Sequence, residues 1–293
     1  MTHRKSLRTL GCAALALVGI VTACTFAEAP KADTAAPPAE HAIALAKRSR
    51  VEGKVVELPA QWDARETAVV ICDMWDDHWC KSAARRCAEI APGVDALAKA
   101  VRAKGGLIVH CPSDTMKFYE GTPARELAKN APKATPPTPL KGWRYLEPAR
   151  EGQLPIDDKD GGCDDEPTCP KPQNKQWPWT RQIKTIEVAP GDAVTQDGGE
   201  VYNLFAQRKV KHVIVCGVHL NMCVLGRTFA IRQLTDWKFD VVLARDLTDA
   251  LYNPRKAPYV SHEKGTELMV EHVEKNWCPT IASEQVVGSS KKN

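Results

Sequence analysis

Short apolar runs alternate along the chain with segments whose apolar residues recur every three or four positions. The runs predict strands and the periodic segments predict helices. Expected strands cover residues 67–73, 107–111, 184–188, 213–216, 240–244 and 280–287, and expected helices cover residues 82–104 with an interruption at Pro92, 198–209, 221–234 and 264–275. Consecutive apolar positions, as in TAVVICD, are typical of strands buried on both faces of a parallel sheet. The pattern predicts a three-layer α/β/α domain with a doubly wound, mostly parallel, Rossmann-like sheet over residues 61–288.

One long segment breaks this alternation. Between about residues 120 and 181, prolines, glycines and acids replace the periodic pattern, and three tryptophans occur at Trp143, Trp177 and Trp179. A loop of this length inside a compact domain is usually functional or disordered. We therefore treat residues 120–181 as an insertion into the α/β domain.

The N-terminal residues predict export. A basic start followed by an apolar stretch has the layout of a signal peptide over residues 1–23. The sequence VTAC places Cys24 where a bacterial lipoprotein carries its lipid, and ordinary cleavage a few residues later is the alternative. Residues 24–60, rich in Ala, Pro and charge, are expected to be a flexible tether, and residues 289–293 a tail. We expect an exported chain, lipid-anchored in the cell envelope and facing the periplasm or the cell surface.

Composition limits the partners and the redox state. The chain of 293 residues has 40 basic and 36 acidic side chains, a balance that gives no indication of nucleic acid binding. An exported protein meets an oxidising compartment, in which disulfides persist. Of eleven cysteines, one leaves with the signal peptide and Cys24 is lipidated, so the nine that remain cannot all pair. Cys163 and Cys169 flank DDEPT and are expected to form a disulfide, with zinc binding as the weaker alternative. Cys223 is the candidate for the unpaired thiol.

Cys223 lies in the most informative stretch, KHVIVCGVHLNMCVLGR at residues 211–227. An apolar run ends at Gly217 and Asn221 fits a helix N-cap, so Cys223 is expected in the first turn of a helix that follows a strand. Free amides and the helix dipole stabilise a thiolate there, although a small buried cysteine would fit the same pattern. Asp73 ends the first strand of the domain. Because ligands bind at the carboxyl ends of parallel strands, Asp73 is expected beside Cys223 as its general base.

Three stretches resemble the isochorismatase-like cysteine hydrolase superfamily, which includes nicotinamidases. They are VVICDMW at residues 69–75, GVHLNMCVLGR at residues 217–227 and VVLARDLTDA at residues 241–250. The similarity spans about residues 66–287, with the 120–181 segment as an insertion. The resemblance implies that Asp73 is the base and Cys223 the nucleophile, and that the backbone N–H groups of His219 and Cys223 form the oxyanion hole. It also implies a cis peptide between Val218 and His219.

The third catalytic residue of that family is a lysine on the strand before the helix that precedes the cysteine strand. Counting back from the helix places this position near residues 187–190, where the sequence has no lysine. Lys184 is the nearest lysine and is the candidate for the role, and Arg181 is the nearest other cation. Without a cation the Asp–Cys pair loses electrostatic support.

The surroundings of the site are expected to bind a small ring-bearing molecule. Candidate pocket residues are Trp75, His78, His110, Trp179, Arg181 and Asn221, and Trp79, Trp143 and Trp177 are further candidates for an apolar wall. The resemblance to nicotinamidases also implies a metal beside the site. Asp76, His78 and His110 supply suitable ligand types without a recognisable spacing, so a divalent metal is compatible with the sequence but not required.

The sequence thus predicts a cysteine hydrolase that acts on a small amide or related C–N substrate through a thioester. Its expected partners are that substrate, a membrane through the lipid anchor, and a second copy of the chain, since relatives often associate. A non-catalytic ligand-binding or structural lipoprotein on the same fold is the main alternative. The number of cysteines suggests, as a third possibility, a redox-responsive or metal-responsive thiol protein.

Overall fold

The structure, a computed structural model, describes residues 37–288. The expected signal peptide, Cys24, the first part of the expected tether and the tail at 289–293 lie outside the described residues. Strands are β1 Ala42–Val51, β2 Lys54–Asp63, β3 Thr67–Cys72, β4 Leu107–Cys111, β5 Ala193–Val194, β6 His212–Val218, β7 Asp240–Asp249 and β8 Thr280–Ile281. Helices are α1 Lys81–Ala103, α2 Met116–Tyr119, α3 Pro123–Lys129, α4 Pro148–Glu151, α5 Gly198–Arg208, α6 Cys223–Gly226, α7 Ile231–Asp236, α8 His262–Asn276 and α9 Glu284–Val287, with short 3-10 turns at Ala39–His41 and Ala64–Glu66.

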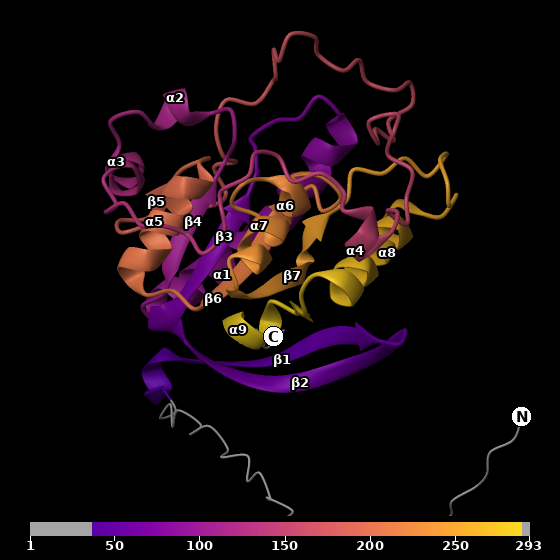
Figure 1. The fold of residues 1–293 in the computed structure, drawn as a ribbon. Coiled ribbons are helices and arrows are strands. Elements are labelled where there is room, and N and C mark those ends of the chain that lie inside the picture. Colours follow the sequence, from indigo (N-terminus) through magenta and orange to yellow (C-terminus); the bar gives the residue numbers. More distant parts are fainter. Residues whose placement is uncertain (1–36, 289–293) are drawn as a thin grey trace, which may run out of the picture. The chain divides into compact units, whose positions relative to one another are not determined.

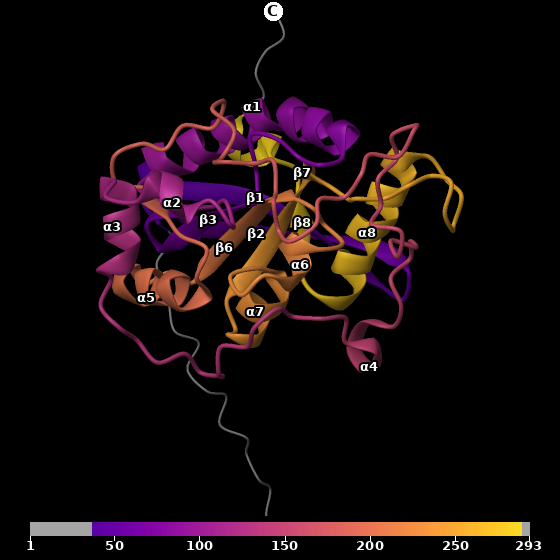
Figure 2. The ribbon, with the colours of Figure 1, turned by 90° about the horizontal axis from the view of Figure 1, so that it is seen from above.

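These strands form one sheet in the order β2-β1-β8-β7-β6-β3-β4-β5. Strands β3 to β8 are parallel to one another, and β1 is antiparallel to both β8 and β2. Alternate residues of β3 point to opposite faces: Val69 and Ile71 pack with α1 and α9, whereas Val70 and Cys72 pack with α5, α7 and α8. Figure 2 shows the sheet between these two layers. The predicted three-layer, mostly parallel α/β/α fold is confirmed.

Helix α1 continues through Pro92, where the sequence predicted an interruption. A proline removes one helical hydrogen bond, but packing of the apolar face against the sheet holds the helix together. The next residue, Gly93, permits close contact with β7, because an added Cβ would lie 2.6 Å from the Cδ2 atom of Leu247. The helix and the strand therefore approach each other closely at this point.

Two of the expected strands were placed wrongly. Residues 184–188 form no strand, and β5 at Ala193–Val194 takes the place beside β4. Residues 280–287 divide into the two-residue strand β8 and the helix α9. Short apolar runs do not distinguish a strand from a loop or a buried helical turn, and here tertiary pairing decides.

The C-terminal part of the expected tether is a β-hairpin. Strands β1 and β2 pair in antiparallel register from Ala42 with Asp63 to Val51 with Lys54. Glu52 and Gly53 connect them, and both have positive φ, 52° and 79°, as a type I′ hairpin turn requires. The Glu-Gly pair at the turn was the available signal, and the linker-like composition of the flanking residues concealed it.

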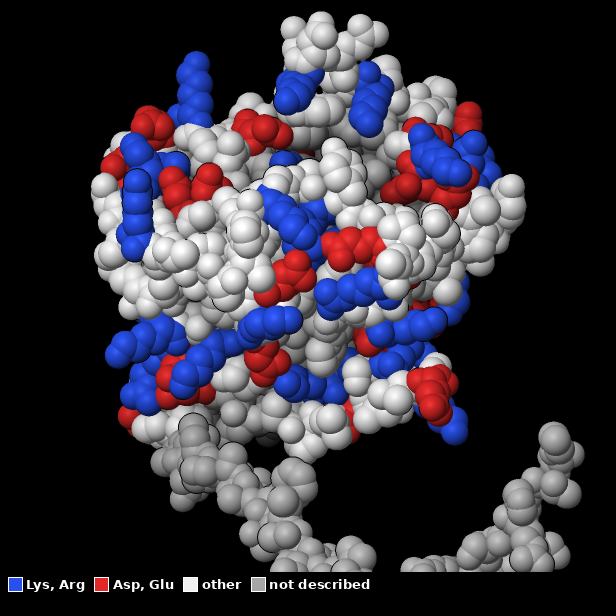
Figure 3. Space-filling view, in the orientation of Figure 1, with Lys and Arg blue, Asp and Glu red and all other residues white. Residues whose placement is uncertain are grey.

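Apolar contacts and ion pairs attach this hairpin to the domain. Ile43, Leu45 and Trp62 are buried in the same apolar cluster as residues of α1, β8 and α9. Lys47 and Arg48 of β1 pair with Asp240 and Glu274 of the domain at 3.1 and 2.6 Å. Figure 1 shows the long hairpin at the sheet edge, and Figure 3 shows acidic and basic side chains interspersed over that face.

The insertion at residues 120–181 contains α3 and α4 and otherwise irregular chain. Figure 1 shows it arching over the end of the sheet near which α6 lies. No helix in residues 37–288 is both long and apolar enough to cross a membrane.

Candidate active site

Two neighbouring parallel strands bring Asp73 and Cys223 together. β3 pairs with β6, Asp73 follows β3 directly, and the turn after β6 leads to Cys223. Asp73 is fully buried and has a φ of 48°, which is uncommon for a residue with a side chain. Its amide N–H donates to the carbonyl of Cys111 at 3.1 Å, and its Oδ1 accepts from the amide of Ser113 at 2.7 Å. Backbone groups of the neighbouring strand end therefore fix the carboxylate in place.

A glycine lets the two strand ends approach. Gly217 has a φ of 106°, and an added Cβ would lie 2.0 Å from the carbonyl oxygen of Cys72. The register between β6 and β7 also shifts between Val215 and Gly217. Only glycine adopts this conformation at this contact without strain. The residue thus allows the turn after β6 to lie against the end of β3.

The turn itself is closed by backbone hydrogen bonds. The peptide between Val218 and His219 is cis, as the resemblance implies. The amides of Met222 and Val224 both donate to the carbonyl of His219, at 3.0 and 3.2 Å. Cys223 is the first residue of α6.

The helix that follows is much shorter than the sequence predicted. α6 has four residues, and α7 begins only at Ile231. Asn221 caps no helix: its amide group donates to Asp158 Oδ2 at 2.8 Å and to the carbonyl of Leu251 at 3.1 Å, which joins the turn to the insertion. A single helical turn has only a small dipole. The expected stabilisation of the Cys223 thiolate by a helix is therefore not met.

Local electrostatics keep the proton on Cys223. Burial, followed by the negative charge of Asp73, raises the pKa of the Cys223 thiol above its ordinary value, while Arg227 acts in the opposite direction. The side chain is therefore a neutral thiol at pH 7. Its attack on a substrate requires a proton acceptor, and the adjacent carboxylate of Asp73 is placed to be one.

The cation of the site is Arg227. Its Nε donates to Oδ2 of the fully buried Asp73 at 3.0 Å. Its guanidinium also lies 5.5 Å from the ring of Trp143, within range of a cation–π contact. This arginine is the last residue of the motif at residues 217–227, and the sequence did not predict its role. The available signal was its position four residues after Cys223, one helical turn away and therefore on the same side.

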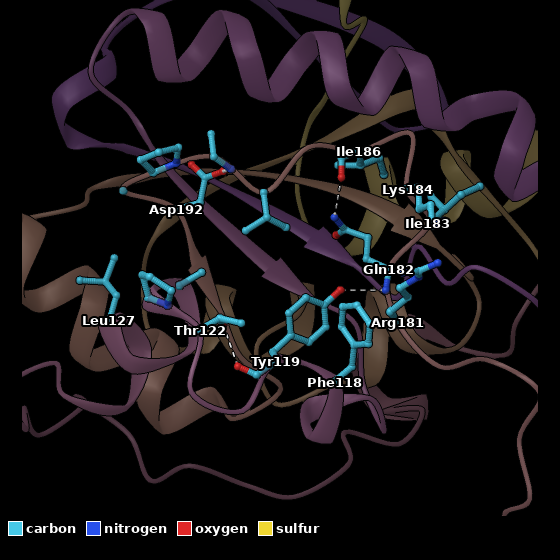
Figure 4. A pocket seen from close by; sticks show the side chains of 16 residues that line it. Phe118, Tyr119, Thr122, Leu127, Arg181, Gln182, Ile183, Lys184, Ile186 and Asp192 are labelled. Carbon is cyan, nitrogen blue, oxygen red and sulfur yellow. Dashed lines mark hydrogen bonds between the residues drawn. The ribbon is translucent and has the colours of Figure 1, made fainter.

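Neither cation that the sequence suggested reaches the site. The strand before α5 is β5, so the position of the family lysine falls at Thr195 and Gln196, which carry no charge. Lys184 is exposed and, with Arg181, lines a separate pocket of about 680 Å³ that contains none of the residues around Cys223. Figure 4 shows both side chains at the end of that pocket away from Leu127. The misplaced strand at 184–188 caused this error.

A cavity of about 180 Å³ lies beside Cys223. Its wall includes Arg227, His78, His219 and five tryptophans, Trp75, Trp79, Trp143, Trp177 and Trp179. Trp179 stacks between the other two rings of one row, with centroid distances of 4.2 Å to Trp75 and 4.9 Å to Trp177. Three of the five tryptophans belong to the insertion, which therefore shapes the cavity.

The insertion reaches Cys223 through another close glycine contact. At Gly226 an added Cβ would lie 2.8 Å from the Trp143 ring, and the Gly226 carbonyl accepts from the amide of Arg144 at 2.7 Å. Any side chain at this position would displace the tryptophan.

The cavity wall also presents polar atoms. Nε2 of His219 and Nε1 of Trp179 are buried and have no hydrogen-bond partner among the described residues. Burial lowers the pKa of His219 well below its ordinary value and that of His78 to about 4, so both rings are neutral at pH 7. Nδ1 of His78 accepts from the amide of Cys80 at 3.1 Å, which places the ring proton on Nε2. The wall thus offers neutral hydrogen-bonding groups between aromatic rings.

The other predicted pocket and metal residues do not converge. His110 is fully buried, with Nδ1 3.0 Å from Gln182 Oε1 and Nε2 3.1 Å from Asp192 Oδ2. Asp76 accepts from the amide of Thr180 at 2.8 Å. Asp76, His78 and His110 therefore form no common ligand set.

The nine cysteines within residues 37–288 are all free. The expected disulfide between Cys163 and Cys169 is absent from this part of the chain. The sulfur atoms of both residues lie instead against Oδ2 of Asp165, at 3.5 and 3.2 Å. The segment between the two cysteines turns its own carboxylate toward them.

No protein-family model matches the sequence, and neither does any curated protein. Similar solved structures include a cysteine hydrolase from Pseudomonas syringae pv. phaseolicola, 14% identical over 77% of this chain and 92% of that chain, with a TM-score of 0.48. An isochorismatase from Pseudomonas putida is 13% identical over 76% of this chain and 91% of that chain, with a TM-score of 0.45. An isochorismatase family protein from Desulfovibrio vulgaris is 19% identical over 71% and 90%, with a TM-score of 0.40. At these identities and TM-scores the likenesses carry no argument about the reaction, which rests on the residues around Cys223.

Proposed function

We propose that this protein is an isochorismatase-like cysteine hydrolase that cleaves the C–N bond of a small amide or a related substrate. One observation carries the proposal. Asp73, Cys223 and Arg227, from two adjoining strand ends, converge beside a cavity walled by five tryptophans. A thiol, a carboxylate within its reach and a cation that holds the carboxylate are the groups that covalent acyl transfer requires.

In the first half of the reaction, Sγ of Cys223 attacks the carbonyl carbon while its proton passes to the carboxylate of Asp73. The tetrahedral oxyanion lies against the backbone N–H groups of His219 and Cys223, as the resemblance implies. The C–N bond then breaks, the nitrogen takes the proton from Asp73, and the amine or ammonia leaves. A thioester on Cys223 remains.

In the second half, water attacks the thioester carbon and gives a proton to Asp73. The C–S bond breaks, the carboxylic acid product forms, and the proton on Asp73 returns to the sulfur of Cys223. The atoms of the cycle balance with the substrate and water alone.

Arg227 supplies the positive charge that a lysine supplies in the family. A guanidinium does not lose its proton in proteins, so Arg227 cannot transfer protons and acts by position and charge. It holds Oδ2 of Asp73 while the amide of Ser113 holds Oδ1, so both oxygens of the carboxylate are fixed in position.

The cavity favours a small planar acyl group. At about 180 Å³ it lies below the ~300–1,000 Å³ of drug-sized sites, so the substrate part that enters it is small. The tryptophan row offers flat surfaces for a ring, and the unpaired Nε1 of Trp179 and Nε2 of His219 offer hydrogen bonds to its polar atoms. We therefore propose aromatic or heteroaromatic carboxamides as the first substrates to test.

The test is a panel of aromatic and aliphatic primary amides, with ammonia release as the measurement. Wild-type protein is expected to hydrolyse a ring-bearing amide, and Cys223→Ala is expected to abolish turnover with an unchanged circular dichroism spectrum. Cys216→Ala is the control, because Cys216 lies in the same strand–turn unit but faces the opposite layer. Full activity in Cys223→Ala would refute the assignment.

A non-catalytic ligand-binding protein is the second candidate, and the raised pKa of Cys223 favours it. Rapid acid quench of protein mixed with an amide, followed by mass spectrometry of Cys223, separates the two functions. A hydrolase is expected to show a thioester on Cys223. A binding protein is expected to show no thioester, although the amide still protects Cys223 from alkylation by iodoacetamide.

We also propose, from the N-terminal sequence, that the enzyme is exported and lipid-anchored through Cys24, with the membrane as its partner. Cys24→Ala is expected to release the mature chain from the membrane fraction. Unchanged membrane association would contradict lipidation.

A further inference from the structure

Three thiols converge on one carboxylate oxygen where α1 begins. The sulfur atoms of Cys80, Cys163 and Cys169 lie 3.3, 3.5 and 3.2 Å from Oδ2 of Asp165. The ligand atoms of Cys80, Cys163 and Asp165 all lie within 4.8 Å of one another, and Cys169 lies outside this group. Cys80 comes from the turn after β3, and the other three residues come from the insertion. None of them lines the cavity beside Cys223.

The distances fit a tetrahedral metal. With metal–sulfur bonds of about 2.3 Å and a metal–oxygen bond of about 2.0 Å, a tetrahedral centre places each sulfur roughly 3.5 Å from the oxygen. The three sulfur–oxygen distances of 3.2 to 3.5 Å agree with that value. Three thiolates and one carboxylate are a ligand set for zinc rather than for calcium or magnesium, which take oxygen ligands.

The start of α1 supplies donors to the same cluster. The amide of Ser82 donates to Asp165 Oδ2 at 3.0 Å, and its hydroxyl donates to the other oxygen of this carboxylate. Such donors fix the orientation of metal ligands. The cluster thus combines convergent ligands with the hydrogen bonds that support them.

The cluster has only one weak positive partner. Cys80 and Cys163 are buried, and the one ion pair of Asp165 among the described residues is to Arg85 at 3.9 Å. A bound dication balances the charge of the thiolates and the carboxylate, and the thiol protons pass to solvent.

We infer that Cys80, Cys163, Cys169 and Asp165 form a structural zinc site that fastens the insertion to the start of α1. Three of these ligands already converge, and Cys169, which contacts the same carboxylate oxygen, closes the site as the fourth ligand when it moves toward the metal. Trp79 precedes Cys80 and Gly161 lies two residues before Cys163, and both line the cavity beside Cys223. Zinc therefore holds two parts of the cavity wall together. This inference stands apart from the proposed hydrolase activity.

The experiment measures zinc per chain by elemental analysis in the full chain, purified without chelator and under reducing conditions. Wild-type protein is expected to carry about one zinc per chain. Cys80→Ser and Cys163→Ser are expected to reduce zinc to background. Cys87→Ser is the matched control, since Cys87 is a buried cysteine on the same helix and contacts Met74 instead of the cluster. It is expected to keep its zinc.

Two further measurements keep the result interpretable if a serine variant fails to fold. Asp165→Asn retains the shape of the side chain and is expected to weaken zinc binding by 10-fold or more. Cobalt added to metal-free wild-type protein is expected to show intense thiolate-to-cobalt charge-transfer absorption. Wild-type protein that stays metal-free after incubation with zinc, or a disulfide between Cys80 and Cys163 in chain purified separately without reductant, would overturn the inference. Cys223→Ala is expected to keep full zinc, which separates this outcome from failure of the hydrolase proposal.

Discussion

Two cysteines of this protein stand at the start of a helix beside a carboxylate, and the charges around them differ. Cys223 begins the four-residue α6, and Arg227 binds the carboxylate of Asp73 next to it. Cys80 precedes the 23-residue α1, and no side-chain cation lies closer than 3.9 Å to the carboxylate of Asp165 among the described residues. The carboxylate of Asp73 therefore has a counter-charge. The carboxylate of Asp165 has two further thiols beside it instead of a close cation.

This difference separates the proposed nucleophile from the proposed metal ligand. At Cys223 the thiol proton has one acceptor, the carboxylate of Asp73. The net charge of the site therefore does not change when the thiol ionises, and Arg227 balances the negative charge that remains. At Cys80, three thiols and an acid accumulate negative charge on ionisation, and only a dication balances it. The number of thiols and the position of Arg227 distinguish the site at Cys223 from the cluster at Cys80. The position of each cysteine at the start of a helix does not.

The largest expected effect comes from removing the proposed base, Asp73, beside Cys223. Asp73→Asn keeps the shape of the side chain but accepts no proton, so kcat on the active amide is expected to fall by about 10³-fold. The measurement is steady-state ammonia release, with zinc content as the control. A variant with wild-type kcat would show that a group other than Asp73 accepts the proton of Cys223. A loss of zinc would show that the site at Cys223 and the cluster at Cys80 are not independent.

Removing the arginine tests whether it is the counter-charge. Arg227→Ala leaves the buried Asp73 carboxylate unpaired and is expected to lower the free energy of unfolding by about 3 kcal/mol, as seen by urea denaturation. Arg227→Lys is expected to recover part of the loss because it restores the charge without the guanidinium geometry. Equal stability of the alanine variant and the wild type would contradict the role given to this ion pair.

A smaller effect is expected at Glu151, which anchors the insertion without zinc. Burial acts to raise the pKa of Glu151. Hydrogen bonds from His272 and Arg232 outweigh burial and lower this pKa to about 2. A lowered folded-state pKa stabilises the protein above the unfolded value of 4.5, and this contribution is lost as the pH falls from 4.5 toward 2. Glu151→Gln is expected to lose about 2 kcal/mol at pH 7 and to retain zinc.

The measurement for Glu151 is urea denaturation at pH 7 and at pH 3. The gap between wild type and Glu151→Gln should narrow at the lower pH, because the wild-type carboxylate is then losing its advantage. A gap that does not change with pH would show that the loss comes from shape rather than charge.

The smallest expected effect is on substrate binding. Trp179→Ala removes the central ring of the tryptophan row and is expected to lower kcat/KM for an aromatic amide by about tenfold, mostly through KM. Phe118→Ala, in the separate pocket of Figure 4, is the control and is expected to change neither constant. A larger loss for an aliphatic than for an aromatic amide would contradict stacking.

Local patterns predicted the parts of the fold that local physics decides. The continuous apolar runs identified β3 and β4 to within a residue, because a strand buried on both faces needs apolar side chains at every position. Patterns failed at the hairpin, where alternation was weak and composition resembled a linker. They failed again at β5, a two-residue strand that exists only because it pairs with β4.

For the site, the sequence alone identified Asp73 and Cys223, since both follow strands that a parallel sheet must align at one edge. Arg227, the convergence of three cysteines on Asp165 and the closing of the insertion over Cys223 were decided by tertiary structure. These depend on which distant segments meet, and a side chain acquires its partner only when the chain between them has folded. Residue type and spacing therefore determined where the chemistry begins, whereas the long-range contacts determined which charge completes it.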